Sequence, residues 1–176
     1  VGGAARNAVY YKIFGKKLPQ RDYDMVVIGN YRKFIQNLRS LGFVYGKIRR
    51  NYQIVLKMKR IARPKHIYKD WVVLDMNLTA KGNINHILRE KVNFTIGGFA
   101  IPLEYITSSE WLGKTVKLPG SMHAIRTKQL RINSAKHPTN LFACIRFMSQ
   151  GFKPPPKEEV KILLGRFPKI NKKIFS

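Results

Sequence analysis

The first clear hydrophobic pattern in the chain is that of a helix. Phe34, Ile35 and Leu38 recur at the three- and four-residue spacing that places side chains on one helical face. Asn30 stands where a capping side chain belongs, and Gly42 stands where a left-handed terminating residue is common. The pattern therefore predicts a helix between these two positions.

Alternation with a period of two follows, and it predicts strands. Apolar residues occupy every second position over residues 52–59 and again over 71–79, and most of the intervening positions are polar or basic. Pro64 ends the first ladder because proline has no N–H to donate. A short helix is predicted at 84–88, and an apolar strand at 99–101 follows Gly97-Gly98.

Beyond residue 107 the pattern weakens. Two short apolar stretches, 125–132 and 141–148, are read as strands. The run of prolines at 154–156 predicts an extended spacer, and the glutamates after it open a helix that ends near Gly165.

These elements predict an α+β fold. It has a small α/β N-terminal subdomain and then a mostly β subdomain, followed by an extended irregular C-terminal tail. The expected boundaries are 1–24 for an irregular basic N-terminal arm, 25–66 for the α/β subdomain, 67–106 for the mostly β subdomain and 107–176 for a C-terminal extension.

Charge narrows the function. The 176 residues carry 34 Lys and Arg against nine Asp and Glu, a formal net charge of +25. The stretches 25–69 and 111–157 contain no acidic residue at all. Such an excess opposes compaction unless a polyanion neutralises it, and nucleic acid is the commonest polyanion. Basic residues interleaved with aromatic residues favour RNA over a merely solvated face.

Metal and membrane functions find little support. The four histidines are scattered, and Cys144 is the single cysteine, so neither a paired-ligand spacing nor an internal disulfide is available. No apolar run approaches the roughly 20 residues of a membrane helix. We therefore predict no metal site, no cofactor and no membrane partner.

Catalysis is not indicated either. The acids are few and dispersed: Asp22 and Asp24 fall in a predicted loop, and Asp75 falls on the polar face of a predicted strand. No Gly-rich phosphate loop with its Lys-Ser/Thr is present. The sequence thus predicts a protein that is not an enzyme and has no small-molecule substrate.

Five segments in chain order resemble the small-subunit ribosomal protein S-eight family. They are residues 30–44, a helix running into Gly-Phe-Val; 60–64, Arg-Ile-Ala-Arg-Pro; 67–69, Ile-Tyr-Lys; 79–82, Thr-Ala-Lys-Gly; and 97–98, Gly-Gly. A second, weaker resemblance, through Gly15-Lys16-Lys17 and Tyr45-Gly46-Lys47, is to the mitochondria-specific small-subunit protein S-thirty-four.

The S-eight resemblance implies binding to small-subunit rRNA. Together with the basic stretches, it gives a set of expected RNA-binding residues: Arg32, Lys33, Lys47, Arg49, Arg50, Arg60, Arg63, Lys65, Tyr68, Thr79, Lys81, Gly82, Gly97 and Gly98.

The expected function is that of a structural constituent of the mitochondrial ribosomal small subunit, located in the matrix. Its expected partners are small-subunit rRNA and neighbouring ribosomal proteins. Two alternatives stay open: an RNA-processing enzyme or its accessory subunit, and a basic structural subunit of another organellar complex.

Overall fold

The computed structural model confirms the α+β class. It describes residues 1–20, 23–41, 44–48, 53–59, 71–79, 82–134 and 140–166.

Helices dominate the described chain. They are α1 (Gly2–Phe14), α2 (Tyr31–Ser40), α3 (Ile84–Lys91), α4 (Trp111–Lys114), α5 (Ser121–Thr127), α6 (Asn140–Met148) and α7 (Lys157–Arg166), with 3₁₀ turns η1 (Thr95–Gly97) and η2 (Leu103–Tyr105). The strands are β1 (Tyr23–Ile28), β2 (Val44–Ile48), β3 (Gln53–Lys59), β4 (Trp71–Thr79), β5 (Phe99–Ala100) and β6 (Val116–Lys117).

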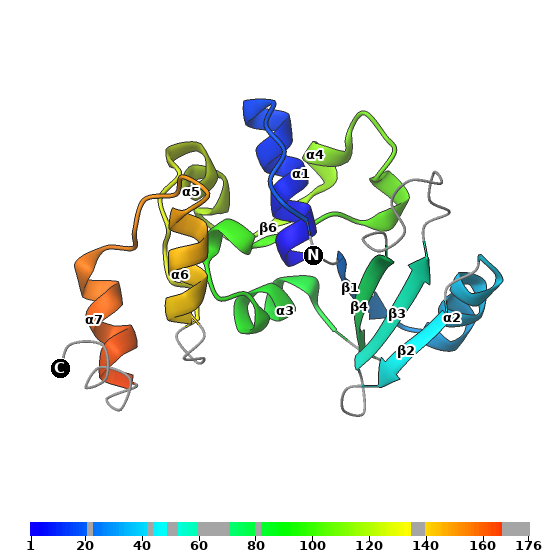
Figure 1. The fold of residues 1–176 in the computed structure, drawn as a ribbon. Helices are drawn as coiled ribbons and strands as arrows, with labels where there is room; N and C mark the ends of the chain where they lie inside the picture. Colours follow the sequence, from blue (N-terminus) through cyan, green and yellow to red (C-terminus); the bar gives the residue numbers. More distant parts are fainter. Residues whose placement is uncertain are drawn as a thin grey trace, which may run out of the picture.

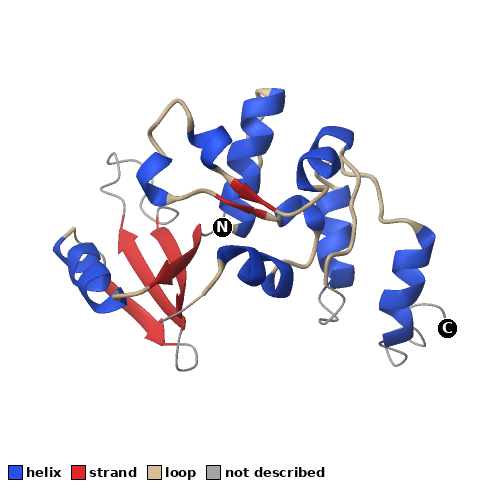
Figure 2. Cartoon of the chain, turned by 180° about the vertical axis from the view of Figure 1, so that it is seen from behind, coloured by secondary structure: helices blue, strands red, loops and turns tan. Residues whose placement is uncertain are grey.

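The larger sheet has four strands in the order β1-β4-β3-β2. β1 runs parallel to β4, while β3 pairs antiparallel with both β4 and β2. A parallel pair needs a crossover connection, and here it contains α2, β2 and β3. The sheet therefore brings together two strands that lie far apart in the sequence (Figure 2).

Helix α2 covers one face of this sheet, as its amphipathic pattern predicts. Ile35 packs with Leu74 and Met76 of β4 in a buried cluster, and Met25 and Val27 of β1 pack against it. The Asn30 side chain accepts a hydrogen bond from the Lys33 backbone N–H at 3.4 Å, which confirms the predicted cap.

The main core lies on the other side of the molecule, around α1. Val9 and Tyr10 of α1 are buried with Phe99 of β5, Ile125 of α5 and Phe147 of α6. In Figure 1 α1 stands between the sheet on one side and α5, α6 and α7 on the other, with α7 farthest from the sheet. Helix α1 thus joins the sheet to the helical half.

Helix α7 is held by one acidic side chain. The Glu159 carboxylate accepts a hydrogen bond from the Ile132 backbone N–H at 2.7 Å and pairs with Arg131. Leu163, one turn further on, is fully buried. The helix predicted after the proline run is confirmed.

Several other predictions from the pattern are confirmed. The strands expected at 52–59 and 71–79 are β3 and β4, the short helix at 84–88 is α3, and the apolar strand at 99–101 is β5.

Three predictions of local structure were wrong. Residues 2–14, expected to be irregular, form α1: the glycines suggested a loop, but Gly15 ends the helix in a left-handed conformation, φ 66°. The stretches 125–132 and 141–148 were expected to be strands, but residues 125–127 end α5, residues 128–132 form no strand beyond isolated bridges, and residues 141–148 lie in α6. A short apolar run does not distinguish a buried helix from a strand.

Within the described ranges, no helix is long and apolar enough to cross a membrane.

Candidate active site

Asp24 of β1 and Asp75 of β4 are register partners in the parallel pair of the four-stranded sheet. Met25, the neighbour of Asp24, packs toward α2, and successive residues of a strand alternate between faces. Asp24 therefore lies on the sheet face opposite α2. Asp24 belongs to a strand, not to the loop expected from the sequence.

The start of α1 approaches Asp24 closely. The Val1 nitrogen donates to the Asp24 carbonyl oxygen at 2.7 Å, which ties the start of the helix to β1. Gly2 has φ +62°, and a Cβ added there would lie 3.2 Å from Asp24 Oδ2. Glycine is suited to Gly2 both by its conformation and by the lack of space.

The first turn of α1 has no side-chain cap and no acidic residue. The first N–H groups of a helix lack partners within it and carry partial positive charge, so they attract anions such as phosphate. The two glycines leave this backbone unobstructed beside a carboxylate. The arrangement has the parts of a site for a phosphate ester and a cation.

Arg6 is a buried charge next to these groups. It is 7% exposed, and its guanidinium lies 4.7 Å from the centre of the Phe147 ring. Burial, and secondly the charge of Arg146, lower the pKa of Arg6 to about 10, while the nearby Asp24 acts in the opposite direction. Arg6 therefore stays cationic at neutral pH.

Asn7 connects Arg6 to the segment that precedes β1. Its Oδ1 accepts hydrogen bonds from Arg6 Nε at 3.0 Å and Nη2 at 2.7 Å. Its Nδ2 donates to the Pro19 carbonyl at 3.1 Å and to Gln20 Oε1 at 2.7 Å. Of the four hydrogen bonds that Asn7 makes, the two to Pro19 and Gln20 link α1 to the segment before β1.

The donor set suits a hard cation. Carboxylate oxygens are the ligands preferred by Mg²⁺. No group of three or more potential ligands gathers among the residues that the structure describes. Asp24 and its register partner Asp75 contribute two carboxylates from paired strands. Two open hollows of about 540 and 310 Å³ lie elsewhere, beside Pro119, Gly120 and His123.

The residues expected to bind RNA are not assembled into one site by the described structure. Arg32 and Lys33 are exposed on α2, Gly82 is exposed before α3, Lys47 lies in β2 and Thr79 ends β4. The rest of the loop and basic-stretch candidates lie outside the described residues: Arg49, Arg50, Arg60, Arg63, Lys65, Tyr68 and Lys81.

Gly97 and Gly98 are buried. A Cβ added at Gly98 would lie 2.6 Å from Ser121 Oγ and 2.9 Å from Leu118 Cβ. One added at Gly97 would lie 3.1 Å from Val92 Cγ1. The space these glycines leave is taken by the protein's own side chains.

The sequence interpretation missed Gly2, Arg6 and Asn7, and it gave Asp24 no role. The sequence does contain a pattern that indicates a role for Asp24. Asp22 and Asp24 stand two positions apart, directly before the apolar run 25–28, and this is the pattern of a strand that begins with acidic residues on one face.

The fold is shared with solved RNA-processing enzymes. The match to the Thermotoga maritima CCA-adding enzyme complexed with tRNA covers 96% of this chain and 37% of the enzyme, with TM-score 0.68 and 20% sequence identity. The match to a CCA-adding enzyme with CTP covers 100% of this chain and 40% of the enzyme, with TM-score 0.68 and 17% identity. The match to a CCA-adding enzyme with ATP covers 96% of this chain and 37% of the enzyme, with TM-score 0.64 and 22% identity.

At this identity the likeness establishes the fold. The chain spans about two-fifths of the length of these enzymes. No family model and no curated protein sequence matches the chain.

The ribosomal interpretation was wrong. The solved structures that share the fold are CCA-adding enzymes, not the S-eight or S-thirty-four proteins. Apart from the helix at 30–44, the segments that suggested S-eight are two to five residues long and contain Gly, Pro, Lys or Arg, and such short runs are common where a basic chain turns. Gly98 is an example: it matches the S-eight Gly-Gly element in sequence, but in this fold it leaves room for the side chains of Ser121 and Leu118.

Three dependent expectations fail with it. The solved structures that share the fold are enzymes determined with CTP, ATP or tRNA. They contradict the expectations that the chain has no enzymatic activity, has no small-molecule substrate and has ribosomal partners. The alternative of an RNA-processing enzyme agrees better with the fold. The expectation of an RNA partner remains consistent with it.

Proposed function

We propose that this chain carries out nucleotidyl transfer to the end of an RNA, in the manner for which CCA-adding enzymes are named. One observation carries the proposal. Over 93% to 100% of its length the chain adopts the fold of such enzymes, and Asp24, whose register partner is Asp75, lies beside the Gly2-Gly3 start of a helix.

The chemistry is a displacement at phosphorus. The terminal hydroxyl of the RNA attacks the α-phosphorus of a nucleoside triphosphate, the hydroxyl proton is lost, and diphosphate leaves. Charge accumulates on the phosphate oxygens, so catalysis requires cations and N–H donors already in place. Among the described groups, the start of α1 supplies N–H groups and the sheet supplies carboxylates.

Asp24 and Asp75 would hold a divalent cation. When bound, such an ion neutralises phosphate charge and lowers the pKa of the attacking hydroxyl. The two-residue period of a strand predicts that Asp22 shares the face of Asp24, although it lies outside the described residues. Asp22 is therefore a third candidate ligand on sequence grounds.

The role proposed for Arg6 and Asn7 is to position the Asp24 carboxylate. Arg6 contributes a fixed positive charge near Asp24, and Asn7 holds the Pro19–Gln20 segment against α1. Both keep the carboxylate of β1 at a set distance from the start of the helix. Neither needs to react.

The test uses labelled CTP or ATP, Mg²⁺ and a tRNA transcript that lacks its 3′ end. Asp24→Asn and Asp75→Asn should each lower incorporation by more than roughly 100-fold, since even outer partners of metal ligands contribute 10- to 100-fold. Glu110→Gln, an exposed acid on another loop, is the matched control. Equal activity in all three variants would remove the carboxylate pair from the mechanism.

The RNA contacts expected at Arg32, Lys33 and the other basic positions stay predictions, as does the mitochondrial location.

A further inference from the structure

Lysine ammonium groups lie over aromatic rings near the end of α1 that is farther from Asp24. Lys128 Nζ lies 4.9 Å from the centre of the Phe14 ring and 5.8 Å from that of Tyr10. Lys17 Nζ lies 5.9 Å from the Tyr11 ring, and Tyr11 is 50% exposed. Rings attract cations through their quadrupole, so these ammonium groups are held in place.

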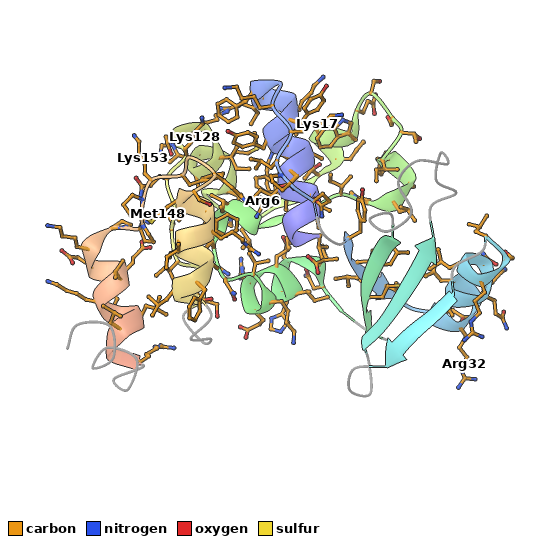
Figure 3. All side chains as sticks on the ribbon, viewed as in Figure 1. Arg6, Lys17, Arg32, Lys128, Met148 and Lys153 are labelled. Atoms are coloured by element: carbon orange, nitrogen blue, oxygen red, sulfur yellow. The ribbon has the colours of Figure 1, made fainter. Side chains whose placement is uncertain are left out.

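Lys153 lies next to Lys128, and we name Lys17, Lys128 and Lys153 the lysine ridge; Figure 3 shows Lys17 on one side of α1 and Lys128 and Lys153 on the other. The Lys153 backbone N–H donates to the Lys128 carbonyl at 2.7 Å, and the Leu130 N–H donates to the Lys153 carbonyl at 3.1 Å. The backbones of Lys128 and Lys153 are therefore fixed relative to each other. The Lys153 side chain is exposed.

The backbone of Lys128 is unusual. Its φ is 53°, and among the described residues it is the one non-glycine with a positive φ. A left-handed backbone crowds the Cβ of any residue other than glycine, so glycine would suit this C-cap position of α5 better than lysine.

The ridge lacks counter-charges. Its three lysines come from segments 1–21 and 111–157, neither of which contains an acidic residue. In the part of the chain that the structure describes, the ion pairs Arg131–Glu159 and Lys161–Glu158 do not involve the ridge. A fixed cluster of unneutralised cations beside exposed rings fits the phosphate backbone of RNA better than it fits open solvent.

We propose that the lysine ridge binds phosphates of the same RNA whose end is extended at Asp24. The inference rests on the proposed function and adds a second contact surface to it. Helix α1 spans Gly2–Phe14, so at 1.5 Å per residue it separates the two surfaces by about 18 Å. At 3.4 Å per base pair of duplex, that distance equals about five base pairs.

This spacing predicts a length dependence. An RNA of about three nucleotides occupies the site at Asp24 without reaching the ridge. A hairpin with a stem of about ten base pairs and a short single-stranded 3′ end reaches both surfaces. The ridge should therefore affect the hairpin and not the trinucleotide.

The experiment compares two triple variants of the full chain. Lys17→Gln/Lys128→Gln/Lys153→Gln removes the ridge, and Lys157→Gln/Lys161→Gln/Arg166→Gln removes three exposed cations of α7. Both lose three positive charges, so a general effect of net charge acts on both alike. Fluorescence anisotropy measures the affinity for each RNA from low to high salt.

The ridge variant should flatten the log–log salt dependence for the hairpin by about 2 to 3, since each phosphate contact contributes about 0.9. The control variant should keep the wild-type slope. An equal slope change in both variants, or an equal loss for trinucleotide and hairpin, would overturn the proposal. The proposal would also be overturned if the ridge variant bound RNA as tightly as the wild type and lost only its binding to anionic lipid vesicles.

Two provisions keep the test decisive. If the triple ridge variant lacks a thermal unfolding transition, Lys17→Gln/Lys153→Gln tests the same slope without touching the strained position. The slope is measured without nucleotide, so a wild-type chain that binds RNA steeply but adds nothing would contradict the proposed function and not the ridge.

Discussion

Replacing Gly98 by alanine tests the packing on which the helical half depends. Gly98 has φ −76°, so its conformation suits any residue, and only space opposes a side chain. The added Cβ would lie 2.6 Å from Ser121 Oγ and 2.9 Å from Leu118 Cβ. Ser121 and Leu118 are buried, at 0% and 4% exposure.

The neighbouring groups have little freedom to move away. The Gly98 carbonyl accepts the Leu118 backbone N–H at 2.8 Å, and its own N–H donates to the Thr95 carbonyl at 2.9 Å. The backbone hydrogen bond holds Leu118 beside Gly98, and the Ser121 hydroxyl donates to the same Gly98 carbonyl at 3.4 Å. Overpacking of this kind costs about 1–3 kcal/mol. For a chain of this length that is a fall in Tm of roughly 2–12 °C.

The assay is thermal unfolding followed by circular dichroism, with Gly113→Ala as the matched control. Gly113 lies in α4, and an added Cβ there would meet nothing within 4 Å. Its replacement should stabilise by about 0.5–1 kcal/mol through helix propensity. A Gly98→Ala variant as stable as the wild type would refute the packing argument, and so would equal losses in both variants.

Two further predictions concern Asn7 and Cys144. Asn7→Asp keeps the acceptor for Arg6 but sets a carboxylate oxygen against the Pro19 carbonyl and Gln20 Oε1. The substitution should lower kcat for nucleotide incorporation by roughly 10- to 100-fold, with little change in KM or Tm. A Tm loss that accounts for the whole drop in activity would make Asn7 merely structural. Burial raises the pKa of the Cys144 thiol to about 11, so the folded state keeps its proton while the unfolded thiol ionises near 9. Between pH 9 and 11 the folded state therefore binds more protons than the unfolded state. The free energy of unfolding, measured in urea, should fall with rising pH across that window by more in the wild type than in Cys144→Ala. Parallel pH curves for the two proteins would contradict this.

Local pattern predicted the elements whose periodicity is complete within one segment. The spacing of Phe34, Ile35 and Leu38 with the cap at Asn30 predicted α2, and alternation predicted β3 and β4. Helix α1 was missed because glycines stand at both of its ends. There they serve a close approach to Asp24 and a C-cap, roles that only the folded chain reveals.

The candidate site depends on contacts that periodicity does not encode. Asp24 and Asp75 are 51 positions apart and meet only through the parallel pairing of β1 with β4. Sequence placed Asp75 correctly on a strand, but it gave no sign of the partner strand or the register. Net charge predicted an RNA ligand and could not separate a ribosomal component from an enzyme, because both neutralise phosphates with the same side chains.

The most direct test of the account is whether the purified wild-type chain lengthens an RNA. A tRNA transcript without its 3′ end is incubated with Mg²⁺ and CTP or ATP, and the product is resolved at single-nucleotide resolution and weighed by mass spectrometry. The account predicts products longer by whole nucleotides that disappear with Asp24→Asn. Unchanged RNA under conditions where the wild type is folded and RNA-bound, or extension that persists in Asp24→Asn, would contradict it.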